Sequence, residues 1–366
     1  MFTSTLLGLF VQAGYFHWDD NVKQLVKTAN LFPSDLLDRL VTVRDLLAQR
    51  TDLPDYLGMQ VAGFLFETVE GLIKKLHTVQ VESENATYAN FRSEFNENNL
   101  GYALAAAVAE KNSPDNLHRW EDLVQRYIFK PLAMGHSVFA DLSENYYSKF
   151  AQSVFLNGGS RRAVPATWLE TVRPLGASKS ICSSAKDMAH WLFYLASKGR
   201  QTPTLHGILN EKTIEELWKP VVPKTTKSIY RNSSQAVSLL LENYGMGWNV
   251  GSYAGFRLLQ ESGGILGYLS SIWVLPDQKI GVFSTISGSL ENSPDIVDII
   301  SEYLTALLLP EVSEISDRTV CDRKLNRLPA RVCECTQPSR GFFTDTNRNY
   351  THPFLGDIQV HNTKNM

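Results

Sequence analysis

The sequence predicts a mixed α/β (α+β) fold, in which an antiparallel sheet is flanked by helices and joined to a mainly helical part. Apolar residues recur at helical spacing through most of residues 1–240. After Tyr244, segments rich in β-branched and aromatic residues alternate with turn residues. A last, mostly apolar segment at 295–309 has helical spacing and could cover one face of the sheet. This order of elements excludes a purely helical bundle.

The helical part begins near the start of the chain. Apolar residues of Phe2–Gly14 recur on one face, and Gly14 is typical of a residue that ends a helix. The same spacing predicts further helices at 22–26, 41–49, 59–76, 100–111, 120–129, 184–197 and 211–218.

Three strands are predicted at Phe256–Gln260, Tyr268–Leu275 and Lys279–Ile286. Pro276-Asp277-Gln278 forms a tight connection between the second strand and the third. Gly263, Gly264 and Gly267 are expected to bound the first connection. The strands therefore form a three-stranded meander.

We expect one domain over residues 1–309, divided into a mainly helical part at 1–240 and the sheet hairpins with their covering helix at 241–309. Residues 310–366 read as an irregular, cysteine-containing tail. The formal net charge of −3 does not favour binding to nucleic acid or to an anionic membrane surface. No apolar run approaches the roughly 18 residues of a membrane-spanning helix.

Cysteines and sequons suggest an oxidising compartment. Cys321 is expected to pair with Cys333 or Cys335, although the sequence does not fix which. Three Asn-x-Ser/Thr sequons begin at Asn85, Asn232 and Asn349, which favours the secretory pathway for the parent protein, although no signal peptide is evident. The cysteine spacing fits no zinc site and the histidines are scattered, so we expect no metal and no cofactor.

Six short segments follow one another in the order found in one known family. They are Val41–Asp55, Asn98–Leu104, Tyr127–Met134, Cys182–Trp191, Tyr244–Trp248 and Leu275–Val282. Together they resemble the serine β-lactamase and D-alanyl-D-alanine carboxypeptidase superfamily, in its class C-like, penicillin-binding-protein-like branch. The resemblance covers residues 1–309 and implies a β-lactamase/transpeptidase-like fold. It also implies that two N-terminal strands of that fold are missing here, which would leave Lys279–Ile286 as an exposed edge strand.

The resemblance implies a Ser-x-x-Lys motif as nucleophile and base, and that motif would lie just before Phe2. The chain holds a single Ser-x-x-Lys, at Ser183–Lys186. That segment matches a different, non-catalytic part of the family, so we interpret it as a helix N-cap followed by an exposed lysine.

Two further family motifs are altered. Glu97-Asn98-Asn99 stands where the family has Tyr-x-Asn, so Asn99 is kept and the tyrosine is replaced by Glu97. Glu261-Ser262-Gly263-Gly264 stands where the family has a cation followed by Ser-Gly-Gly. A carboxylate at Glu261 would repel a substrate carboxylate, while Gly263 and Gly264 keep the backbone that faces the cleft.

Two functions follow from these residues. The first is a catalytically silent β-lactamase-related protein that binds or scaffolds, with a small molecule or a peptide as the ligand of its cleft. The second is a parent protein that is an active serine hydrolase of amide, peptide or ester bonds. Self-association through the exposed edge strand is a further expectation.

Overall fold

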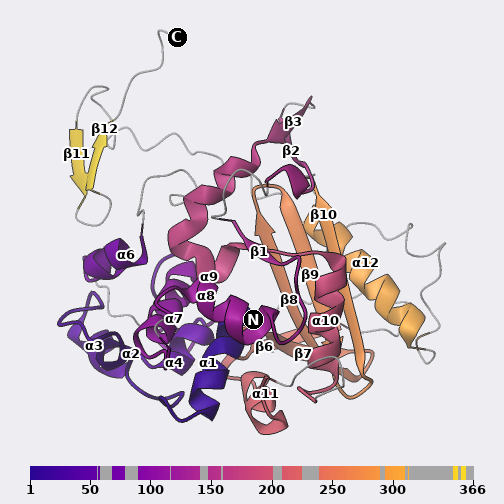
Figure 1. Cartoon of the computed structure of the whole chain (residues 1–366), viewed down its shortest axis with the longest axis horizontal. Coiled ribbons are helices and arrows are strands. Elements are labelled where there is room, and N and C mark those ends of the chain that lie inside the picture. The colour runs from indigo at the N-terminus through magenta and orange to yellow at the C-terminus, as the bar shows by residue number, and fades with distance from the viewer. Residues whose placement is uncertain are drawn as a thin grey trace.

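The structure is a computed structural model. It describes residues 1–55, 57, 68–78, 90–115, 117–140, 147–157, 160–200, 208–224, 239–288, 293–309, 312, 349–352 and 356–359. A helical part lies beside an antiparallel sheet, and the chain start lies between the two (Figure 1). This arrangement confirms the predicted fold class. The division into domains at 240 and 309 stays a prediction.

Eight helical segments are described before residue 130. They are α1 (Phe2–Gln12), α2 (Val22–Val26), α3 (Asp35–Leu40), α4 (Val43–Leu47), α6 (Val69–Leu76), α7 (Asn99–Lys111), α8 (Trp120–Val124) and the π-helical turn η1 (Gln125–Phe129). The helix predicted at 120–129 is therefore divided into two kinds of helix. Residues 59–67 of the helix predicted at 59–76 lie outside the described residues.

The middle of the chain alternates short strands with helices. Its elements are β1 (Val138–Phe139), η2 (Tyr147–Lys149), β2 (Ser153–Asn157), β3 (Ser160–Val164), η3 (Ala166–Leu175), α9 (Gly176–Lys179), β4 (Ile181–Cys182), α10 (Ala185–Ala196) and α11 (Glu211–Leu217). β1 pairs with β4, and β2 pairs with β3. None of these four strands was predicted, because each is short and lacks a clear alternation of polar and apolar residues.

Within the described ranges, the main sheet has six antiparallel strands in the order β10-β9-β8-β7-β6-β5. They are β5 (Val222–Pro223), β6 (Leu239–Tyr244), β7 (Asn249–Tyr253), β8 (Phe256–Ile265), β9 (Tyr268–Leu275) and β10 (Ile280–Ser287). The predicted three-stranded meander is thus the half of a larger sheet formed by β8, β9 and β10. The expected end of the first strand before Gly263 and Gly264 is wrong, because both glycines pair with β9 inside β8.

Helices cover both faces of this sheet. Side chains alternate along β9, so Ile272 and Val274 join the core shared with the helical part, whereas Trp273 and Leu275 pack in a second cluster on the opposite face. α10 lies on the first face, where Leu192 contacts Gly281. α12 (Ser293–Leu308) lies on the second face, as predicted for the covering helix. β10 stands at one end of the strand order among the described strands, as predicted.

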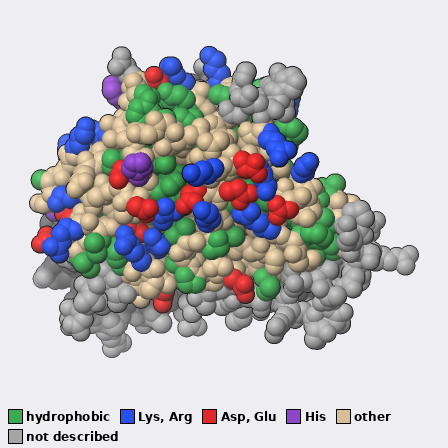
Figure 2. Space-filling view, turned by 90° about the horizontal axis from the view of Figure 1, so that it is seen from below, with side chains coloured by type: hydrophobic (Ala, Val, Ile, Leu, Met, Phe, Trp, Pro, Cys, Tyr) green, Lys and Arg blue, Asp and Glu red, His purple; other side chains and the backbone are tan. Residues whose placement is uncertain are grey.

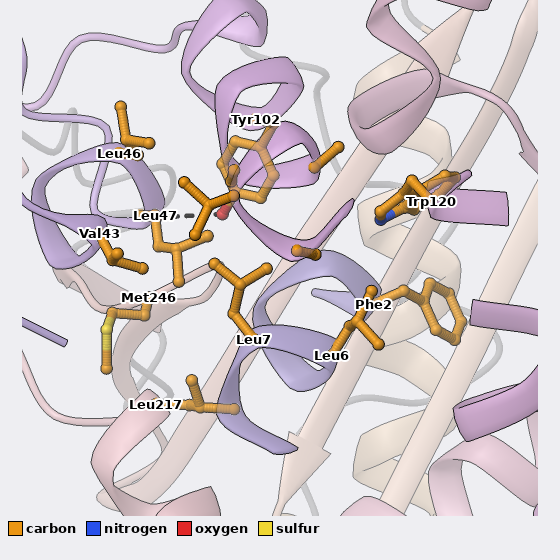
Figure 3. Close-up of a cluster of buried hydrophobic side chains, with 14 of the residues drawn as sticks. Phe2, Leu6, Leu7, Val43, Leu46, Leu47, Tyr102, Trp120, Leu217 and Met246 are labelled. Atoms are coloured by element: carbon orange, nitrogen blue, oxygen red, sulfur yellow. Dashed lines mark hydrogen bonds between the residues drawn. The ribbon is translucent and has the colours of Figure 1, made fainter. Parts of the chain in front are cut away.

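The core of the helical part forms around α1, whose Leu6 and Leu7 are fully buried. Figure 3 shows these two leucines among side chains from α4, α7 and α11. At the start of α1, the ring of Phe2 lies 4.4 Å from that of Trp191 on α10. This contact joins α1 to α10, the helix that lies on the first face of the sheet.

A buried carboxylate fixes the segment that precedes α7. Asp45 is fully buried and completes a capping box with Thr42 at the start of α4. Its two oxygens also accept hydrogen bonds from Arg50 Nε at 2.7 Å and from Arg92 Nη2 at 2.8 Å. Because Arg92 belongs to the 90–98 segment, this ion-pair cluster holds that segment against α4.

The charged surface carries both signs. Figure 2 shows Lys and Arg side chains interspersed with Asp and Glu on the face seen from below. This agrees with the small net charge of −3. Among the described residues, no helix has the length and apolar character needed to cross a membrane.

Candidate functional site

A cleft of about 870 Å³ opens between one face of the sheet and the segments around α9 and β4. Its sheet wall comes from β8, β9 and β10, and its opposite wall includes Lys179 and Ser183. Apolar side chains of Phe150, Ile272 and Phe283 line it together with these polar groups. The cleft therefore combines an apolar interior with a few polar positions, which is typical of a ligand site.

Part of β8 forms the floor of this cleft, and one side of that part is free. We define the floor as Glu261–Gly264. β7 pairs with β8 only as far as Gln260, whereas β9 pairs with β8 as far as Ile265. Among the described strands, none pairs with the other side of residues 261–265. Backbone groups on this free edge can accept an extended ligand as an added strand.

Gly263 and Gly264 leave their part of the floor without side chains. A Cβ at Gly264 would lie 2.8 Å from Leu269 Cδ2, and one at Gly263 would lie 3.2 Å from Ser270 Oγ. Ser262 and both glycines are exposed to the cleft. The family resemblance predicted that the backbone of Gly263 and Gly264 faces the cleft, and the structure places Ser262 and both glycines there.

Glu261 is the acidic group of the floor. Its side chain is half-buried, and burial raises its pKa to about 7. The Met1 ammonium, Lys224 and Lys179 favour the charged form, whereas Glu97 opposes it. Among the residues that the structure describes, its hydrogen-bond donor is the hydroxyl of Tyr244, 3.4 Å from Oε2.

Tyr244 and Gln49 form a line of hydrogen bonds that ends at Glu261. Tyr244 is buried, and burial together with the charge of Glu261 raises its pKa well above the usual value. Gln49 Nε2 donates to the Tyr244 hydroxyl at 3.0 Å. Gln49 Oε1 accepts from the backbone N–H of Asn98 at 2.6 Å. Gln49 thus links the floor of the cleft to the start of α7.

A close backbone approach adds two hydroxyls to this cluster. Gly247 has a positive φ of 90°, and a Cβ there would lie 2.6 Å from Ser4 Oγ and 3.1 Å from Tyr102 Oη. The Tyr102 hydroxyl donates to the carbonyl of Leu47 at 3.0 Å (Figure 3). A side chain at residue 247 would displace these hydroxyls, so glycine is needed here.

Glu97 lies beside the cleft rather than in its floor. Its side chain is 64% exposed, and Lys179 Nζ lies 3.6 Å from Oε1. Lys179 itself lines the cleft. The family motifs align Glu97 and Glu261 with separate catalytic positions. In the structure Lys179 interacts with both, because it forms an ion pair with Glu97 and its charge influences Glu261.

Asn99 is buried and engaged elsewhere. Its side-chain amide nitrogen lies 3.2 and 3.1 Å from the two carboxylate oxygens of Asp55. Its backbone N–H also donates to Asp55 Oδ1 at 3.3 Å. Asn98, not Asn99, caps α7 by accepting from the N–H of Gly101. The role in binding a substrate amide, expected of Asn99, stays a prediction.

The Ser183–Lys186 segment is a helix start. Ser184 is the N-cap of α10 and accepts from the N–H of Asp187 at 3.2 Å, and Lys186 is exposed. The N-cap interpretation is therefore confirmed. Ser183 lines the cleft, and its hydroxyl lies 2.8 Å from that of Ser137. Ser137 in turn donates to Asp187 Oδ2 at 2.8 Å.

Lys224 is a further cation whose charge influences Glu261. It donates to Asn249 Oδ1 at 2.6 Å and lies over the ring of Phe95 at 4.5 Å. Burial lowers its pKa, and Glu261 and Glu97 oppose that change. From Asn249 a line of side-chain hydrogen bonds continues across the sheet through Gln260 and Ser271 to Asp298 on α12.

Sequence analysis assigned no role to Tyr244, Gln49, Lys179 or Lys224. Tyr244 lies in a segment that resembles the family, and that resemblance was the one signal that could have singled it out. The other three come from separate parts of the chain with no local motif, so only the fold brings them together.

Several predicted features lie at the edges of the description. Asn85, Asn232, Cys321, Cys333 and Cys335 lie outside the described residues. Asn349 begins β11 (Asn349–His352), which pairs with β12 (Gly356–Gln359). Within the described part of the chain, no group of three His, Cys, Asp or Glu side chains could hold a metal ion.

Comparison with known proteins decides the family. The family model described as Beta-lactamase matches residues 1–306. The chain belongs to the β-lactamase family. The family's serine hydrolases and penicillin-binding proteins are therefore the frame in which its altered motifs are interpreted.

Two curated relatives show the range of this family. The chain is 27% identical over 187 residues to Gigasin-6 of Magallana gigas, which covers 51% of this chain and 58% of that protein. It is 23% identical over 310 residues to an unguisins hydrolase of Aspergillus violaceofuscus, which covers 80% of this chain and 52% of that protein. The chain thus spans little more than half the length of these relatives.

Solved structures share the fold. The octameric penicillin-binding protein homologue from Pyrococcus abyssi has a TM-score of 0.65 at 23% identity, covering 84% of this chain and 64% of that one. The D-amino acid amidase from Ochrobactrum anthropi has a TM-score of 0.62 at 17% identity, covering 85% and 83%.

Proposed function

We propose that residues 1–366 form a ligand-binding protein of the β-lactamase family that does not form an acyl-enzyme. The cleft keeps the bare floor and the free strand edge on which an extended ligand can lie. The Ser-x-x-Lys at 183–186 caps α10, and its lysine is exposed. The role of this segment as a helix start supports a non-catalytic Ser183.

The observation that carries this proposal is Glu261. Acyl transfer in this family uses a cation at this point of the floor to bind the substrate carboxylate. Here the group is a half-buried carboxyl that receives one long hydrogen bond, of 3.4 Å, from Tyr244. A substrate carboxylate placed beside it would meet a like charge, and a like-charge contact in a partly buried site is unfavourable.

The experiment is a direct test for acylation. Purified protein of residues 1–366 is incubated with nitrocefin and with p-nitrophenyl acetate, and separately with a fluorescent penicillin and a fluorophosphonate probe. We expect hydrolysis no faster than a heat-denatured sample, and no labelled band. Labelling would refute the proposal, and its loss in Ser183→Ala would identify Ser183 as the nucleophile.

A second candidate function is supported by the names of the relatives. One curated relative is called a hydrolase and one structural neighbour an amidase. A parent protein that hydrolyses amide, peptide or ester bonds is the alternative, and the labelling experiment on the longest available form of the protein decides between the two.

We also propose self-association through β10. Among the described strands β10 has one partner, β9, and its other side is unpaired. Such an edge can pair with a second copy, and one structural neighbour is described as octameric. Light scattering after size exclusion should show a species larger than the 41.1 kDa monomer. Substituting Thr285, which is exposed on β10, with proline should shift it toward the monomer.

Passage through the secretory pathway is proposed from the three sequons alone. Expression of the parent protein in a eukaryotic cell should give a product whose apparent mass falls after treatment with an N-glycosidase. An unchanged mass would refute this proposal.

A further inference from the structure

Glu261 has acceptor capacity that the described residues do not use. Its Oε2 receives the Tyr244 hydroxyl at 3.4 Å. Among the described residues, no cationic group forms a salt bridge with Glu261, although the Met1 ammonium, Lys224 and Lys179 are near enough to influence its charge. Lys224 Nζ donates to Asn249 at 2.6 Å, and Lys179 Nζ lies 3.6 Å from Glu97. A carboxylate at the floor thus faces the cleft with room for a donor.

The opposite wall presents a second acceptor. The Asp187 carboxylate is buried and accepts from the N–H of His136 and from the Ser137 hydroxyl, both at 2.8 Å. A carboxylate can only accept, so the single hydroxyl proton of Ser137 is directed at Asp187. The 2.8 Å contact between Ser137 and Ser183 then requires Ser183 to donate. The lone pairs of the Ser183 oxygen therefore remain available to a donor in the cleft.

The rest of the lining combines apolar side chains with polar ones, Lys149 and Lys179 among them. Phe150, Leu169, Ile272 and Phe283 contribute to the walls. Contact with these side chains would stabilise a ligand with an apolar body through loss of water from both surfaces. The two acceptors and the apolar walls together define the ligand by chemistry.

We propose that the cleft selects ligands that carry a primary ammonium group on an apolar body, with Glu261 as the counter-charge and Ser183 as a second acceptor. This inference rests on the proposed function, since it names what the non-acylating cleft binds. A ligand with a carboxylate at the same place is disfavoured, which is the reverse of the preference expected from the family.

The pH dependence follows from the groups around Glu261. The pKa of Glu261 is about 7, where burial and Glu97 raise it and the Met1 ammonium, Lys224 and Lys179 partly counter that rise. Burial lowers the pKa of the Met1 ammonium from 8.0, so this competing cation loses its proton in the same direction of pH. An alkylammonium group stays charged to a pH of about 10. Affinity for an amine should therefore increase between pH 6 and pH 8, as the carboxyl of Glu261 loses its proton.

The experiment compares three probes of similar shape, phenethylamine, 2-phenylethanol and 3-phenylpropionate, by calorimetry or ligand-observed NMR at pH 8. We expect the amine to bind about tenfold more tightly than the alcohol, as for a partly desolvated charge-assisted hydrogen bond, and the carboxylate to bind most weakly. Glu261→Gln should reduce the preference for the amine to about twofold while the affinity for the alcohol is kept. Glu97→Gln, a matched change at an exposed glutamate, should keep most of the preference.

The outcomes separate the inference from the proposed function. Equal affinities for all three probes, or a preference that survives in Glu261→Gln, overturns the inference and leaves a non-acylating binding cleft. No binding of any probe overturns both. If Glu261→Gln does not fold, Glu261→Asp shortens the side chain but keeps its charge. It should weaken the amine severalfold and leave the alcohol unchanged, and an unchanged amine affinity overturns the inference.

Discussion

Asp45 and Glu261 are both carboxylates withdrawn from water, but their surroundings differ. Asp45 is fully buried and receives hydrogen bonds from Thr42, Arg50 and Arg92. Glu261 receives one long bond from the neutral hydroxyl of Tyr244. The satisfied group holds α4 and the 90–98 segment together. The under-satisfied group stands at the floor of the cleft, where it reduces stability and remains available to a ligand.

The largest expected effect comes from breaking the satisfied site. Asp45→Ala should lower the free energy of unfolding by about 3–5 kcal/mol, because two arginines lose their partner and α4 loses its capping box. Urea unfolding followed by fluorescence measures this. Glu94→Ala, at an exposed position on the same segment, should change it by no more than about 0.5 kcal/mol. Similar losses in both variants would show that Asp45 is not the anchor.

Glu261→Gln should have the opposite sign. Burial raises the pKa of Glu261 from 4.5 to about 7, so the folded state holds this proton more tightly than the unfolded state. The stability associated with Glu261 is thus fully present below about pH 4.5 and is lost as the pH rises through 7. The variant should be more stable than the wild type by about 2 kcal/mol at pH 8, and by little at pH 4.5.

The measurement is thermal or urea unfolding of both proteins at the two pH values. Comparing variant with wild type is necessary because burial also raises the pKa of Glu110 to about 7. Glu97→Gln serves as the exposed control. A Glu261→Gln variant that is less stable at pH 8 would mean that the carboxylate is better satisfied than its contacts indicate.

Asp187 provides an intermediate case, with the smallest expected effect. It is buried and bound by neutral donors, among them Ser137. Ser137→Ala should lower the free energy of unfolding by about 1 kcal/mol, since one donor to the carboxylate is lost. Ser183→Ala removes the hydroxyl that lies farther from Asp187 in the same line of hydrogen bonds. It should lower the free energy of unfolding by less than about half as much. Reversal of that order would place the stabilising contact at Ser183.

The sequence predicted the position of Glu261 but not the side chains that surround it. The family resemblance placed Glu261 at the cleft and showed its change of charge, because the motif is contiguous, although the predicted strand ended one residue earlier, at Gln260. The length of β8 was underestimated, since Gly263 and Gly264 are usual in turns and rare within strands. The partners of Glu261 were missed, because Gln49, Lys179 and Lys224 lie far apart in the chain and meet only through long-range packing.

The cation at Lys224 and the carboxylate of Asp298 have a further consequence. Lys224 can only donate and Asp298 only accepts, so the two amides and the hydroxyl between them must all point the same way. Turning either amide over would break two contacts at once. The hydrogen bonds from Lys224 to Asp298 are therefore all oriented in one direction. A change of charge at Lys224 would alter the hydrogen bonding of Asp298 on α12, which lies on the face of the sheet opposite the cleft.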